Sequence, residues 1–143
     1  MADYYGKGRT NTFLVNDVDN LKQALAGTEF TVEERPEQGA GAVVILASHS
    51  DGAGCWGQLA YPNLNGDEDP DELFVPDIIA THLRDGQIAV FVHAGAEKLS
   101  YLSAYSIAVH SSGQQVRIDI NDIYRLAAET FNVSADAIDS ADY

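Results

Sequence analysis

Short runs of apolar residues, alternating or unbroken, recur along this chain and predict a protein rich in β-strands. The strongest signal lies in residues 86–109, where two apolar runs are joined by a short polar link. Alternation with a period of two indicates a half-buried strand, and a short unbroken apolar run indicates a strand covered on both faces. On these grounds the predicted strands are residues 12–15, 29–34, 42–47, 55–61, 88–92, 101–109 and 115–120.

Three other stretches carry apolar residues three or four positions apart, which predicts helices. Asn16 or Asp17 is expected to cap the first helix. The second is expected to begin near Pro76, with Gly86 as its C-cap, and the third to be capped by Asn121. The three apolar stripes are Val18, Leu21 and Leu25, then Ile78, Ile79 and Leu83, then Ile123, Leu126, Ala127 and Phe131.

The predicted order of elements is β-α-β-β-β-α-β-β-β-α. Most consecutive strands are joined by links too short for a parallel crossover, so the sheet is expected to be mostly antiparallel. Residues 42–47 and 55–61 are expected to form a hairpin, and Val116, Ile118 and Ile120 to point inward. The prediction is an α+β fold, with a sheet of about six to seven strands and about three helices packed on one face.

The length of 143 residues predicts a single domain, residues 1–143. Residues 1–8 are small, polar and rich in glycine and are expected to form a flexible arm, while residues 133–143 form an acidic tail. The start lacks the apolar segment of a signal peptide, and no run approaches the roughly 18 apolar residues of a membrane span. A cytoplasmic location is therefore expected.

The charge of the chain is its least ordinary property. It holds 22 acidic and 8 basic residues, giving a formal net charge of −14 and a pI of about 4.3. No lysine or arginine lies between Arg35 and Arg84, or after Arg125. Such a charge disfavours binding to nucleic acid or anionic membranes and favours basic partners.

Two explanations of the acidity remain open. The carboxylates can imitate a row of phosphates and occupy the basic groove of a nucleic-acid-binding protein, in which case binding weakens steeply with salt. The acidity can instead be an adaptation to high salt, or simply keep the protein soluble. On the first explanation, the expected contact residues are Asp67, Glu68, Asp69, Asp71, Glu72 and Asp77.

Catalytic chemistry has one candidate, Cys55, whose solitary thiol excludes an internal disulfide framework and a multi-cysteine zinc site. Histidines at positions 49, 82, 93 and 110 are available as bases, but no cysteine-hydrolase signature surrounds the thiol. The histidines lack zinc-site spacing, residues 67–72 lack EF-hand spacing, and the glycine-rich residues 49–57 lack a phosphate-loop lysine. No catalytic residue, metal or cofactor is therefore predicted.

Several short motifs carry a resemblance to a known group of proteins. The chain has Arg-Thr-Asn-x-Phe at residues 9–13, Gly-x-Glu-Lys-Leu-x-Tyr at residues 95–101, Asn-Asp-Ile-Tyr at residues 121–124 and Asp-Tyr at residues 142–143. It thereby resembles a family of short, acidic, largely uncharacterised proteins carried by conjugative plasmids, integrative elements and phages. The resemblance implies a context, because small acidic proteins of mobile elements are often anti-defence factors.

The sequence therefore predicts a small acidic binding protein that is not an enzyme. It is expected to be an anti-CRISPR or anti-restriction inhibitor that occupies a basic nucleic-acid-binding surface of a host defence protein, without binding nucleic acid itself. Two alternatives stay open: a small thiol hydrolase using Cys55, and a salt-adapted structural or interaction domain.

Overall fold

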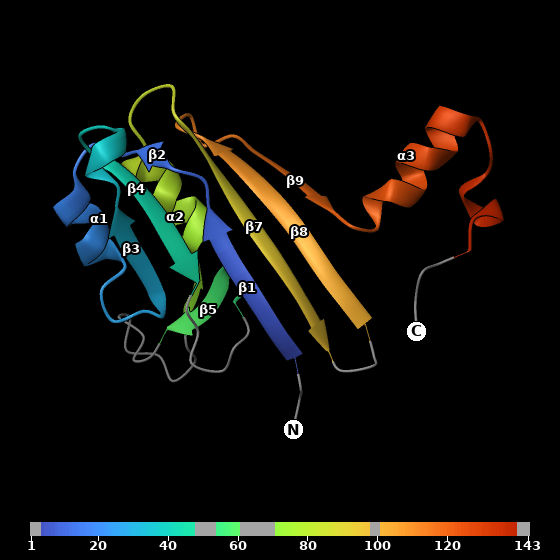
Figure 1. Ribbon diagram of the computed structural model, residues 1–143, viewed down its shortest axis with the longest axis horizontal. Coiled ribbons are helices and arrows are strands. Elements are labelled where there is room, and N and C mark those ends of the chain that lie inside the picture. The colour runs from blue at the N-terminus through green and yellow to red at the C-terminus, as the bar shows by residue number, and fades with distance from the viewer. Residues whose placement is uncertain (1–3, 48–53, 61–70, 98–100, 140–143) are drawn as a thin grey trace.

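The structure is a computed structural model that describes residues 4–47, 54–60, 71–97 and 101–139 (Figure 1). The strands are β1 (Tyr4–Thr10), β2 (Phe13–Leu14), β3 (Phe30–Glu34), β4 (Ala42–Ala47), β5 (Gly57–Ala60), β6 (Asp71–Phe74), β7 (Ile88–Glu97), β8 (Tyr101–His110) and β9 (Gln115–Asp119). The helices are α1 (Val18–Ala24), α2 (Val75–His82) and α3 (Asp122–Phe131), with the 3-10 helices η1 (Pro36–Gln38) and η2 (Ala135–Ala137). The predicted α+β class is confirmed.

The main sheet has seven strands, and all of their pairings are antiparallel. Strand β4 has β3 along one edge and β1 followed by β2 along the other, and β7, β8 and β9 continue the sheet beyond β1. The expectation of a flexible arm at residues 1–8 is therefore wrong for residues 4–8, which lie in the middle of the sheet. The reason is close packing: a Cβ at Gly8 would collide with the backbone carbonyl of Gly54 and press on Trp56.

Residues 42–47 and 55–61 do not form the expected hairpin. Strand β4 pairs with β1, β2 and β3, whereas β5 pairs with β6 in a separate two-stranded sheet. Trp56 explains this arrangement, because its fully buried ring stacks on Phe30 at 5.7 Å and meets Phe91 edge-on at 4.9 Å between ring centroids. The indole therefore holds the start of β5 beneath the main sheet instead of beside β4.

Helices α1 and α2 pack on the same face of the sheet as Trp56, and we call this the covered face. The predicted stripes of both helices supply buried core residues, including Leu21 and Ile79. Asp17 caps α1 by accepting a hydrogen bond from the amide of Asn20 at 3.1 Å. Helix α2 ends before the expected cap, because Leu83 leaves the helix to form a bridge with Val15. None of the described helices is long and apolar enough to cross a membrane.

Strand β9 and helix α3 depart from the expected packing. Val116, Ile118 and Ile120 are 64%, 57% and 43% exposed instead of inward-facing. The alternate β9 residues, which include Arg117, point to the covered side, where Arg117 lies over the ring of Tyr105 at 4.4 Å. Helix α3 buries no residue and extends away from the sheet on the right of Figure 1.

Candidate interaction surface

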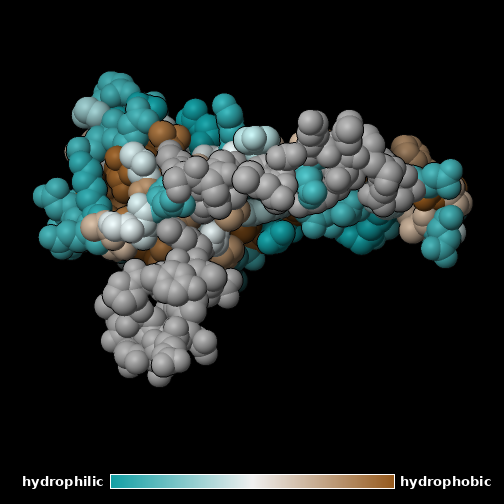
Figure 2. All heavy atoms as spheres, turned by 90° about the horizontal axis from the view of Figure 1, so that it is seen from below, coloured by the Kyte–Doolittle hydropathy of each residue, from teal (hydrophilic) through white to brown (hydrophobic). Residues whose placement is uncertain are grey.

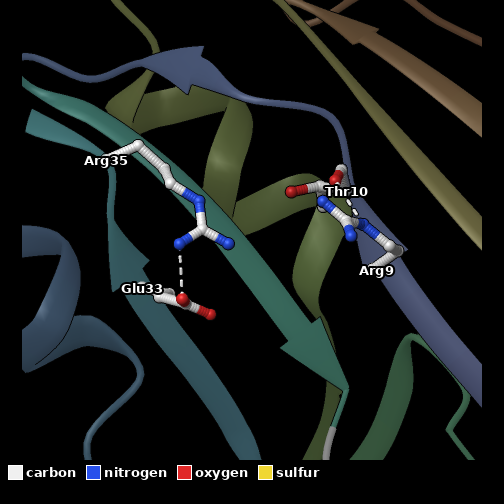
Figure 3. Close-up of polar contacts among 4 residues, drawn as sticks. All are labelled: Arg9, Thr10, Glu33 and Arg35. Carbon is white, nitrogen blue, oxygen red and sulfur yellow. Dashed lines mark hydrogen bonds and ion pairs between the residues drawn. The ribbon is translucent and has the colours of Figure 1, made fainter. Parts of the chain in front are cut away.

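The second face of the main sheet, which we call the open face, carries neither α1 nor α2. In Figure 3, α2 passes behind β4, whereas Arg35 and Glu33 lie in front of it. Residues directly opposite each other in an antiparallel pair share a face, so the register identifies the open-face positions. On β1, β4, β7, β8 and β9 they are Tyr5, Lys7, Arg9, Ala42, Val44, Leu46, Ile88, Val90, Val92, Ala94, Ala96, Leu102, Ala104, Ser106, Ala108, His110, Val116 and Ile118.

None of these positions is an aspartate or glutamate, although the chain holds 22 acidic residues. The charged side chains among them are Lys7 and Arg9, which are both exposed. On the neighbouring strand β3, Glu33 does lie on this face, but it forms an ion pair with Arg35 (Figure 3). The open face of these five strands is therefore apolar with a basic strip along β1.

Apart from Glu33, most of the described carboxylates lie on the covered side, in turns and in helices. Every helix has an acidic residue in its first turn, where the helix dipole favours negative charge. Those residues are Asp19, Glu37, Asp77, Asp122 and Asp136. The helix dipole thus explains the positions of these five acidic residues. It does not explain why the chain has so few lysines and arginines to balance them. Among the described residues, ion pairs join Lys22 to Glu34, Arg35 to Glu33 and Arg125 to Glu129.

The structure shows part of the segment that the sequence singled out for partner binding. Asp67, Glu68 and Asp69 lie outside the described residues. Asp71 and Glu72 belong to β6, which runs directly into α2. In the first turn of α2, Asp77 is exposed and accepts a hydrogen bond from Gln115 Nε2 at 2.6 Å. The described part of the segment thus lies on two consecutive elements at the covered side, and its role in binding stays a prediction.

Exposed large apolar residues show the opposite distribution. In the described part of the chain, all of them lie on the open face, at the end of β9 or in residues 121–139, which we call the arm. They are Tyr5, Ile88, Val92, Leu102, Val116, Ile118, Ile120, Ile123, Leu126, Phe131 and Val133. Figure 2 shows apolar surface at the far end of the molecule, where α3 lies. The sequence signal for this surface was the alternation in β9 and the stripe of α3, both of which suggested burial in the core.

Along β7, β8 and β9 the open face forms a shallow trough. Its floor is made by the small residues Ala104, Ser106 and Ala108 of β8, which the register places between larger residues of the two neighbouring strands. Two hollows of about 470 Å³ and 210 Å³ lie along it. The walls are Ile88 and Val92 on the β7 side and Val116, Ile118 and Ile120 on the β9 side.

Cys55, the alternative catalytic residue, is half-buried at the edge of the core. Its thiol donates a hydrogen bond to the carbonyl of Gly57 at 3.2 Å. The nearby His93 is buried, and its Nδ1 donates to the carbonyl of Gly54 at 2.9 Å, because a carbonyl can only accept. The hydrogen-bond partner shown for the thiol is thus a backbone carbonyl two residues along the chain, and the thiol-hydrolase alternative stays a prediction.

The described residues contain no group of three or more histidine, cysteine, aspartate or glutamate side chains placed to hold a metal ion. Comparisons of the chain with protein-family models, with curated proteins and with solved structures found no match.

Proposed function

We propose that this protein is a stoichiometric inhibitor that acts in the cytoplasm by binding a basic, nucleic-acid-binding host protein. The observation that carries the proposal is the segregation of charge. Carboxylates are absent from the open-face positions of five strands and gather on the covered side, in the turns and at the helix starts. A surface whose carboxylates are concentrated on one side of the protein favours recognition of a basic partner.

The resemblance to proteins of mobile elements makes host defence enzymes, such as CRISPR or restriction complexes, the proposed class of target. Such enzymes bind nucleic acid through rows of cations, and carboxylates on a rigid protein can compete for them. The segment from Asp67 to Asp77 is the proposed contact, because this stretch of the sequence concentrates six acidic residues and has no lysine or arginine.

A pull-down from host lysate, with competing DNA and graded salt, tests the proposal. A partner that both salt and DNA release supports it, and with that partner purified, the protein should block DNA binding with a steep dependence on salt. A partner that neither treatment releases contradicts it. Unfolding of the protein at low ionic strength, with no partner captured, would favour the salt-adaptation alternative.

Charge-reversal variants locate the contact. Replacing Asp67, Glu68, Asp69 and Asp71 by lysine should abolish capture and leave folding intact. The matched control reverses Asp19, Glu37, Asp85 and Glu97, which changes the net charge by the same amount at places outside this segment and outside residues 121–139. Equal loss of binding in both variants would show that net charge alone acts, and normal binding of the first variant would remove the contact assignment.

The Cys55→Ala variant separates binding from the thiol-hydrolase alternative. On the binding proposal the thiol takes no part in recognition, so its removal should leave both folding and partner capture unchanged. An enzymatic activity that is present in the unaltered chain and lost in this variant, with folding intact, would favour the hydrolase.

A further inference from the structure

We propose that two copies of this chain associate by exchanging their arms, with the apolar side of α3 from each copy lying in the trough of the other. This inference does not rest on the proposed function, because it uses the open face instead of the acidic covered side. Four features support it: the length of the trough, the short link to the arm, charge complementarity, and the extent of apolar surface.

The trough and the helix match in length and shape. From Ala104 to His110 the trough runs for six residue steps, or roughly 20 Å at about 3.3 Å per residue. Helix α3 has 10 residues, or a length of roughly 15 Å. A floor of alanine and serine leaves room for a helix to approach the sheet closely. The stripe of α3 supplies three large residues to fill it, Ile123, Leu126 and Phe131, the last 71% exposed.

The chain cannot easily lay its own α3 in its own trough. Ile120 still pairs with the sheet, donating its amide to the carbonyl of Ala104 at 3.1 Å, and α3 begins at Asp122. The link between β9 and α3 is therefore two residues, Ile120 and Asn121, which is the shortest of the usual strand-to-helix connections of about 2–6 residues. A hydrogen bond also fixes the direction in which the chain leaves the sheet at this turn, because Asp119 Oδ1 accepts from the amide of Asn121 at 2.9 Å. A short link between a strand and an unpacked element favours exchange between copies.

Charge favours the same pairing. The arm carries Asp122, Glu129, Asp136 and Asp139 against the single cation Arg125. The open face next to the trough carries Lys7 and Arg9, which lie opposite Ala94 and Val92 in the register of β1 with β7. An acidic arm thus meets a basic strip in a protein whose remaining surface would repel it.

The exposed apolar residues are arranged as in a protein interface. The open face and the arm together expose eleven large apolar residues at about half of their area or more. Apolar residues scattered singly are normal on a monomer, whereas apolar residues gathered on one sheet face and one helix mark an interaction site. Reciprocal exchange covers both the arm and the trough of each copy.

The test is the molar mass of the full chain, measured by sedimentation equilibrium between about 1 and 100 µM. A dimer is expected, and a monomer throughout this range would overturn the proposal. Leu126→Asp in the arm should weaken the dimer roughly 30-fold per arm, or about a thousandfold in total. Arg125→Asp introduces the same side chain on the polar side of α3 and should leave the dimer intact.

Mixing two variants distinguishes exchange from general apolar association. Ser106→Tyr fills the trough and should be monomeric alone, as should Leu126→Asp. An equal mixture should dimerise more strongly than either variant alone, because both substitutions then fall in one contact, which can be lost only once, while the other contact keeps an intact arm and an intact trough. A Leu126→Asp protein that dimerises as strongly as the unaltered chain, or a mixture that dimerises no better than either variant, would contradict arm exchange.

Hydrogen exchange in the unaltered chain gives a readout that no folding defect can disturb. The α3 amides should gain protection as the protein concentration rises, because a helix packed on a partner opens less often. Protection of the α3 amides that does not change with protein concentration would mean that α3 does not bind a second copy of the chain.

Discussion

The junction between β1 and β2 offers the sharpest test of how this fold is held together. Gly8 and Arg9 pair with Ala47 and Leu46, and pairing resumes at Phe13 with Val43, so residues 10–12 face only residues 44–45 of β4. This extra residue is a β-bulge. The displaced ladder leaves the amide of Ile45 facing the side chain of Thr10, whose Oγ1 accepts its hydrogen bond at 2.9 Å (Thr10 is drawn in Figure 3).

Thr10→Val removes the hydroxyl and keeps the shape. Because Thr10 is 2% exposed, water cannot replace the lost acceptor, and an unsatisfied buried amide costs about 1–3 kcal/mol. The added methyl group offsets at most about 0.8 kcal/mol. The expected loss in the free energy of unfolding is therefore about 1–2 kcal/mol.

Urea unfolding followed by the fluorescence of Trp56 measures this loss, because Trp56 is the single tryptophan and is fully buried. The urea midpoint should fall while the slope of the transition stays unchanged. Thr10→Ser is the control: it keeps the acceptor and loses one methyl group, at about 1 kcal/mol. A Thr10→Val protein within about 0.5 kcal/mol of the unaltered chain would refute the assigned role of the hydroxyl.

Two further predictions concern packing and charge. Gly8→Ala should destabilise the protein by about 1–3 kcal/mol in the same urea assay, because the new methyl group meets the carbonyl of Gly54. Gly57→Ala should be nearly neutral, since its nearest neighbour would lie at 3.9 Å; equal losses in both variants would contradict the packing argument. The hydrogen bond that Lys22 donates to the Glu34 carboxylate raises the pKa of Lys22 above 10.5, so the small contribution of this pair to stability is present below pH 10.5 and lost as the pH rises past the folded pKa. Glu34→Gln should return the Lys22 titration, followed by NMR, toward 10.5, and an unchanged titration would contradict the pairing.

The Arg-Thr-Asn-x-Phe motif has a structural explanation at this junction. Thr10 accepts from the amide of Ile45 in β4, opposite the bulge. Asn11 accepts from the amide of Val90 in β7 at 2.7 Å and donates to the carbonyl of Ile88 at 3.3 Å. Phe13 is buried in the core. The motif therefore holds together two strands on either side of β1, whatever function the family resemblance implies.

The sequence by itself determined which residues share a face. The period of two in residues 29–34 and 115–120, and the helical stripes of α1 and α2, correspond to real elements, because backbone geometry sets these periods locally. The α+β class followed from the same local signals. So did the acidity at the helix starts, which depends only on the helix dipole and the chain's own order.

Only the tertiary structure decided which face is covered and which residues meet across the sheet. Strand β1 was taken for an arm because its glycines read as flexibility. Its partners β4 and β7 lie far along the chain, and Gly8 allows β1 to approach Gly54 and Trp56 closely. The apolar side of β9 was assigned to the core because alternation does not say on which side the helices will pack. Two helices cover only one face of a long sheet, so the apolar residues of β9 and α3 are left exposed on the open face and in the arm.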